Sequence, residues 1–161
     1  MHCLEEECIE KLKASGHGNE LIDGQGVDDY CTICWSSSLG QEPSVRLACR
    51  HVFHVECILK ILRNKWLSPR IVFQFLNCPQ CKSIKIDAPH CPPIFKLTSE
   101  IGAFQEEVQK KALLRIKFED LDKDPRLQDP NDDFYNNLQA WAMFKLAYYQ
   151  CFKCKEAYFG G

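Results

Sequence analysis

Eight cysteine and histidine residues in one short stretch constrain this chain more than any other feature. Their spacing is C-x2-C-x14-C-x-H-x2-H-x2-C-x20-C-x2-C, formed by Cys31, Cys34, Cys49, His51, His54, Cys57, Cys78 and Cys81. Thiolates and imidazoles are the usual ligands of structural zinc, and each tetrahedral ion takes four of them. Eight ligands therefore predict two structural zinc ions. A segment this short buries little apolar surface, so the ions would supply much of its folding free energy.

The composition favours an intracellular zinc protein over a secreted disulfide scaffold. The cysteine count of 11 is odd, and the chain begins with an acidic segment where a signal sequence would be basic and then apolar. With 20 basic and 22 acidic residues, the net charge of -2 offers no electrostatic surface for nucleic acid. No apolar run reaches the roughly 18–20 residues of a membrane span. We therefore expect a cytoplasmic or nuclear protein that binds neither nucleic acid nor membrane.

The cysteine-rich stretch contains two predicted elements between its ligands. Apolar residues at helical spacing predict a helix over 55–66, with Trp66 on its apolar face and Pro69 ending it. The alternating, β-rich segment 71–76 predicts a strand leading to Cys78.

The flanking segments predict helices. Residues 4–14 have helical spacing, and a glycine-containing linker follows to residue 29. After a proline-rich break at 88–93, the pattern predicts helices over 97–119 and 134–150, joined by an aspartate-rich loop. Two helices with such a connection favour an antiparallel pair.

The ligand order separates this stretch from other zinc modules. A LIM domain shares the order from Cys31 to Cys57 but needs its next cysteine pair at once, whereas Cys78 follows twenty residues later. A PHD finger has a cysteine at the position of His51. The two histidines, His51 and His54, instead make the pattern resemble a RING domain of the H2 type.

That resemblance implies a small α+β fold in which the two zinc sites interleave as a cross-brace. The first site would be formed by Cys31, Cys34, His54 and Cys57, and the second by Cys49, His51, Cys78 and Cys81. RING domains recruit a ubiquitin-conjugating E2 enzyme that carries ubiquitin. The resemblance therefore implies an E2 and ubiquitin as partners, and no catalytic residue in the chain itself.

The residues that the resemblance assigns to the E2 lie beside the ligands. They are Ile33 within the first cysteine pair, Trp66, Pro79 within the last pair, and Lys82 just after it. The alternative is that Trp66 belongs to the core and that Pro79 only shapes its loop. Many RING domains have an arginine where Lys82 stands, and a lysine lacks the planar fork of donors. This difference argues against efficient direct transfer of ubiquitin to a lysine.

Longer blocks resemble the end region of the PHR family of ubiquitin ligases, in which a RING is followed by a helical linker and a tandem-cysteine domain. The blocks are NKWLSPRIVFQFLNCPQCK (64–82), VQKKALLRI (108–116) and AMFKLAYYQCFKCKEAYFGG (142–161). The resemblance implies a RING-H2 domain over 30–87, a helical linker over 95–150, and the start of a cysteine-rich domain over 151–161. The segment 1–29 lies outside it.

Cys151 and Cys154 form a C-x2-C pair that supplies half of a third zinc site. Three interpretations are open: the chain is a piece of a longer ligase, the missing ligands come from elsewhere in the chain, or both thiols are free. The candidates for the second interpretation are Cys3, Cys8, His17, His90 and Cys91.

Three functions follow from these patterns. The first is an E3 ubiquitin-ligase module that binds an E2 through its RING. The second is a non-catalytic zinc scaffold, or a shortened relative that competes with a full-length ligase. Zinc-dependent nucleic-acid binding is the third, and the balanced charge opposes it.

Overall fold

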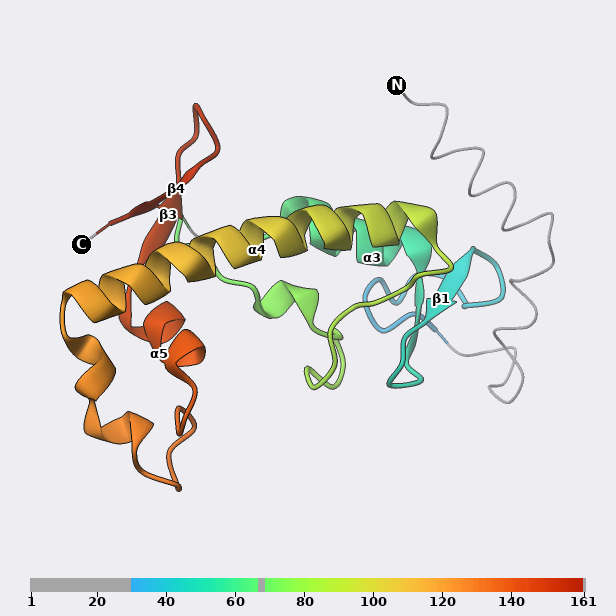
Figure 1. The fold of residues 1–161 in the computed structure, drawn as a ribbon. Helices are drawn as coiled ribbons and strands as arrows, with labels where there is room; N and C mark the ends of the chain where they lie inside the picture. The colour runs from blue at the N-terminus through green and yellow to red at the C-terminus, as the bar shows by residue number, and fades with distance from the viewer. Residues whose placement is uncertain (1–29, 67–68, 161) are drawn as a thin grey trace. The chain divides into compact units, whose positions relative to one another are not determined.

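The computed structural model describes residues 30–66 and 69–160, and the chain forms two compact units (Figure 1). The described part of the first unit is residues 30–65 and 73–100. The second contains Trp66, residues 69–72 and residues 101–160. The helix and linker predicted over 4–29 lie outside the described residues.

The first unit is built on a short hairpin and the helix that follows it. Strand β1 (Ser44–Arg46) pairs antiparallel with β2 (Val52–His54), with Val45 opposite Phe53. Helix α3 (Val55–Asn64) continues directly from β2. It buries residues at i, i+3, i+4 and i+7, which form one face of a helix: Val55, Ile58, Leu59 and Leu62. This small α+β arrangement agrees with the predicted fold class.

Helix α3 ends two residues before its predicted end. Lys65 adopts a left-handed φ of 52°, and its N–H bonds to the carbonyl of Ile61, which closes the last turn. Trp66 is therefore not on the helix. Its ring stacks on that of Phe104 within the second unit, with centroids 5.9 Å apart. The sequence pattern missed this end because lysine gives no signal of a left-handed residue.

The strand predicted over 71–76 is wrong. Gln74–Leu76 form a 3₁₀ turn, and the two ends of the segment bond to different partners. The N–H of Ile71 bonds to the carbonyl of Tyr148, whereas the N–H of Ile86 bonds to the carbonyl of Leu76. Ile71 and Leu76 are both buried although they would lie on opposite faces of a strand, so burial in this segment does not follow the alternation that the sequence suggested.

Helix α4 (Pro92–Phe118) is longer than predicted at its start. The proline-rich segment predicts a break, yet Pro92 and Pro93 open the helix. Proline fits the first turn because the N–H that it lacks has no partner there in any case. The described core residues of α4 in the second unit recur at helical spacing: Ile101, Val108, Ala112 and Ile116.

The helix predicted over 134–150 is shorter, and a strand follows it. Helix α5 (Leu138–Lys145) begins at Asn137, whose side chain caps it by accepting a bond from the N–H of Ala140 at 3.0 Å. Strand β3 (Tyr148–Gln150) then pairs antiparallel with β4 (Ala157–Phe159). The aromatic residues at 148–149 belong to this hairpin. The predicted pair of long helices is thus a 27-residue helix and an 8-residue helix.

Candidate metal centre

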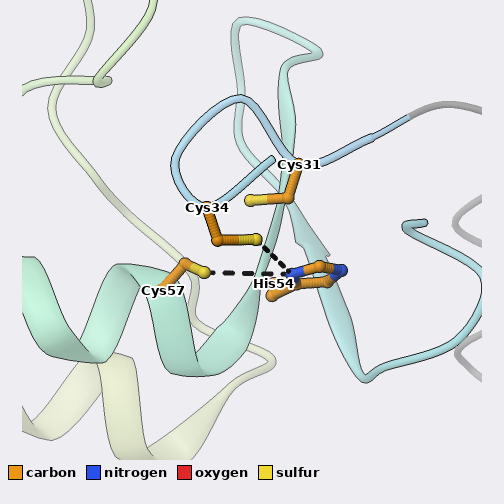
Figure 2. Close-up of side chains that lie close together, drawn as sticks. All are labelled: Cys31, Cys34, His54 and Cys57. Atoms are coloured by element: carbon orange, nitrogen blue, oxygen red, sulfur yellow. Dashed lines mark hydrogen bonds between the residues drawn. The ribbon is translucent and has the colours of Figure 1, made fainter. Parts of the chain in front are cut away.

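The first of two cysteine–histidine sets brings together residues from three parts of the first unit. Cys31 and Cys34 come from the loop before β1, His54 ends β2, and Cys57 lies in the first turn of α3. Figure 2 shows their side chains converging. Their four ligand atoms all lie within 4.8 Å of one another.

The distances within this set suit a tetrahedral ion. Nδ1 of His54 lies 3.5 Å from the Sγ of Cys34 and 3.8 Å from the Sγ of Cys57. Zinc–sulfur and zinc–nitrogen bonds of ~2.3 and ~2.0 Å at tetrahedral angles would place such atoms ~3.5 Å apart. The two distances from Nδ1 of His54 therefore match those of a tetrahedral zinc site.

The second nitrogen of His54 has its own partner. Nε2 lies 3.2 Å from the backbone carbonyl of Ser38, to which its proton can be donated. A metal-bound histidine commonly donates its other ring N–H to a carbonyl, which fixes the tautomer and the ring orientation. His54 is also almost fully buried, with 1% of its surface exposed. Nδ1 is therefore the atom available to a metal.

The second set contains Cys49, His51, Cys78 and Cys81, whose ligand atoms also lie within 4.8 Å of one another. Nδ1 of His51 is 3.3 Å from the Sγ of Cys49 and 3.5 Å from the Sγ of Cys78. Along the chain, one pair of the second set falls between the two pairs of the first. The two sets therefore interleave: the chain passes from the first set to the second, returns to the first, and then completes the second.

The thiol groups differ in their pKa values. Hydrogen bonds from Ser36 lower the pKa of Cys34 to about 6, and hydrogen bonds from Ser83 lower that of Cys81 to about 6. Burial raises the pKa of Cys57 to about 12 and also raises the pKa of Cys49. Each set thus combines a thiol that ionises readily with one that gives up its proton only to a strong competitor such as a metal ion.

Among the described residues, these two sets are the groups of three or more potential ligands that converge. Each offers three thiolates and one imidazole, a donor set typical of structural zinc and poor for magnesium or calcium. All four positions of each set are occupied by protein groups. The arrangement fits two closed structural sites that hold loops in place.

The pattern of a Ring finger domain matches residues 29–82, which includes both sets. This segment is a RING-H2 finger. Its interleaved sets form the cross-brace that the resemblance to a RING domain implies.

Two known ubiquitin ligases are similar to this chain over more than its RING segment. The chain is 44% identical over 137 residues to the E3 ubiquitin-protein ligase MYCBP2 of Danio rerio, covering 85% of this chain and 3% of that protein. It is 41% identical over 162 residues to the E3 ubiquitin-protein ligase highwire of Drosophila melanogaster, covering 99% of this chain and 3% of that one. Homology to these PHR-family ligases therefore extends beyond the RING. The chain spans only a small part of their length.

A weaker similarity is confined to the RING region. The chain is 35% identical over 63 residues to the RING-H2 finger protein ATL10 of Arabidopsis thaliana, covering 38% of this chain and 21% of that protein. None of the helices in the described part of the chain is long and apolar enough to cross a membrane.

The RING residues predicted to contact an E2 lie around the two C-x2-C turns. Ile33 and Pro79 are half-buried inside these turns, and Lys82 is exposed just after the second. Trp66 belongs to the second unit, where it is half-buried and its ring stacks on that of Phe104. Their role in binding stays a prediction.

Trp35 is an exposed residue of the RING that the ligand pattern did not single out. It follows Cys34 directly, 70% of its surface is exposed, and its φ is 56°. A bulky residue in the left-handed region is uncommon and carries some strain. An exposed tryptophan in strained backbone contributes little to the stability of the fold. The signal in the sequence was the position itself, two residues beyond Ile33.

Cys151 and Cys154 lie between strands β3 and β4 of the second unit. The N–H of Lys155 bonds to the carbonyl of Cys151 at 2.9 Å, and Lys155 has a φ of 63°. The backbone N–H groups of Cys154 and Lys153 lower the pKa of Cys151. Neither converging set includes this pair, and Cys3, Cys8 and His17 lie outside the described residues. A third zinc site stays a prediction.

Proposed function

We propose that this chain is a RING-type E3 ubiquitin-ligase module that holds two zinc ions and recruits a ubiquitin-charged E2. The observation that carries the proposal is the pair of interleaved cysteine–histidine sets within the RING segment. The homologous proteins MYCBP2 and highwire, both named E3 ubiquitin-protein ligases, support the assignment. The proposal includes an intracellular location, in the cytoplasm or nucleus, because ubiquitin-charged E2 enzymes work there.

The zinc ions would be structural. The first would be held by Cys31, Cys34, His54 and Cys57, and the second by Cys49, His51, Cys78 and Cys81. Closed coordination leaves no position for water or substrate, so the ions supply fixed loops and no direct chemistry. The loops in turn present Ile33 and Pro79 to a partner.

The chain would act on the E2 by binding and orienting it. Ile33, Pro79 and the exposed Trp35 lie in or next to the ligand loops. Apolar anchors on rigid loops suit a small interface that forms and dissociates quickly. Lys82 would add a positive charge at the rim, where ubiquitin and the E2 meet. Trp66, which is half-buried, is proposed as a further E2 contact.

A non-catalytic scaffold is the second candidate. Lys82 favours it, because a lysine cannot make the two parallel hydrogen bonds of an arginine fork. Such a chain would bind an E2 without accelerating release of its ubiquitin. A shortened relative of this kind would compete with a full-length ligase for the same E2.

A binding experiment tests the proposal in two steps. Metal analysis of the purified chain should give two zinc ions per chain. Titration into a panel of labelled E2 enzymes should then detect binding to at least one, with weaker binding for Ile33→Ala. Fewer than two zinc ions, or no binding to any E2 by a zinc-loaded chain, would contradict the proposal.

A further inference from the structure

Two serines occupy equivalent positions beside the two metal sets. Ser36 follows Cys34 by two residues, and Ser83 follows Cys81 by two residues. The hydroxyl of Ser83 donates a hydrogen bond to the Sγ of Cys81 at 3.1 Å. Ser36 stands at the matching position after Cys34, and hydrogen bonding from Ser36 lowers the pKa of that thiol. A serine thus stands two residues after one ligand cysteine of each set.

The turn that precedes each serine explains this placement. The N–H of Trp35 bonds to the carbonyl of Cys31 at 2.9 Å, and the N–H of Lys82 bonds to the carbonyl of Cys78 at 3.0 Å. Trp35 and Lys82 both adopt left-handed backbone, with φ of 56° and 60°. This conformation reverses the chain immediately after the second cysteine. The turn therefore brings the next residue, a serine in both cases, back towards the sulfur of that cysteine.

The hairpin between β3 and β4 shows that the turn itself does not need a serine. Cys151, Cys154 and Lys155 repeat the same hydrogen bond and the same left-handed residue. The residue two positions after Cys154 is Glu156, whose carboxylate cannot donate a hydrogen bond. Ser36 and Ser83 are therefore not needed to form the turn, and we associate their hydroxyls with the two metal sets.

The cysteines beside these serines are more accessible than the first cysteines of their pairs. Cys34 is exposed and Cys81 is half-buried, as are Cys49 and Cys57, whereas Cys31 and Cys78 are fully buried. A zinc-bound thiolate keeps lone pairs that can attack an electrophile, and an accessible one meets electrophiles from solution. A hydrogen bond to such a lone pair reduces its nucleophilicity. Partners of this kind typically change metal affinity by about 10–100-fold.

We propose that Ser36 and Ser83 are positioning residues that hold an accessible thiolate of each zinc site in place and protect it from electrophiles. The inference rests on the proposed zinc centres. Loss of either hydroxyl would expose one sulfur. With iodoacetamide as the electrophile, that sulfur would form a carbon–sulfur bond, iodide would leave, and the weakened zinc–sulfur bond would break.

Alkylation of the zinc-loaded chain by iodoacetamide tests this role, with the modified cysteine identified by mass spectrometry and zinc release followed with an indicator. Ser83→Ala should raise the alkylation rate of Cys81 about tenfold. Ser36→Ala should do the same at Cys34. Ser83→Thr, which keeps the hydroxyl, should restore the slow rate. Ser37→Ala is the matched control, because Ser37 lies in the same loop but donates to Glu42 at 2.7 Å.

Each result bears on a separate claim. Rates in Ser36→Ala and Ser83→Ala equal to those of the Ser37→Ala control, in a chain that holds two zinc ions, would overturn the role of the serines alone. A rise spread over all six ligand cysteines would signal unfolding and would also overturn a local role. A wild-type chain without zinc would overturn the metal centres, and this inference with them.

Discussion

Nδ1 of His51 lies 3.5 Å from the Sγ of Cys78, although 27 positions separate the two residues along the chain. This contact ties the loop after β1 to the turn that follows the 3₁₀ segment. His51→Ala should therefore remove zinc from the second site and destabilise the first as well, because the two sets interleave. We expect fewer than two zinc ions per chain and a clear fall in the melting temperature.

His90→Ala is the control for that variant, because His90 is exposed and belongs to neither set. It should keep both ions and the wild-type melting temperature. If His51→Ala also kept two zinc ions, the second set would not be a metal site.

Zinc binding should depend on pH in two regimes. Because hydrogen bonds lower the pKa of Cys34 and Cys81 to about 6, these groups are thiolates above that pH and release no proton to zinc. Burial raises the pKa of Cys57 to about 12, so this thiol must release its proton at any lower pH. Apparent affinity should rise with pH throughout and more steeply below about pH 6. Chelator competition at a series of pH values measures this, and a single slope would contradict it.

Trp35→Ala should weaken E2 binding without loss of zinc or fold. The side chain is 70% exposed, so its removal leaves no cavity, while an aromatic anchor at an interface is commonly worth about 1–2 kcal/mol, or roughly tenfold or more in affinity. Calorimetry with the E2 that binds the wild type measures the change. Phe118→Ala is the control, because Phe118 is 86% exposed on α4 of the other unit. Equal affinities of the two variants would remove Trp35 from the interface.

Arg70→Ala should destabilise the second unit. The guanidinium Nη2 donates to the carbonyl of Phe144 at 2.9 Å, near the end of helix α5, and lies 3.4 Å from the carbonyls of Met143 and Leu146. A cation at a helix C-terminus with such a bond is worth about 1–2 kcal/mol. Urea unfolding should show this loss, whereas Lys110→Ala, on an exposed position of the same unit, should not.

The sequence predicted the metal sets well because ligand chemistry depends on residue type and spacing. It predicted helix α3 and most of α4 from the apolar spacing that recurs in Ile58 and Leu62 and in Val108 and Ala112. It failed where tertiary hydrogen bonds decide the backbone. Ile71 bonds to Tyr148 rather than to a neighbouring strand, and the aromatic residues before Cys151 form β3 rather than continuing a helix.

Left-handed residues were the second source of error. Lys65 ends α3, and Trp35 and Lys82 close the ligand turns, all with positive φ. Glycine or asparagine would have indicated such positions from sequence, whereas lysine and tryptophan do not. The exposure of Trp35 and the hydrogen bond from Ser83 to its ligand sulfur depend on these turns, so the structure was needed to show them.

A single-turnover discharge assay tests the central claim most directly. The zinc-loaded chain is mixed with an E2 that carries ubiquitin, with and without free lysine, beside the Ile33→Ala variant. The account predicts faster loss of the E2–ubiquitin thioester with the wild type and a return towards the spontaneous rate with Ile33→Ala. Discharge no faster than the spontaneous rate, with an E2 that the chain binds, would contradict a ligase module and leave a zinc scaffold.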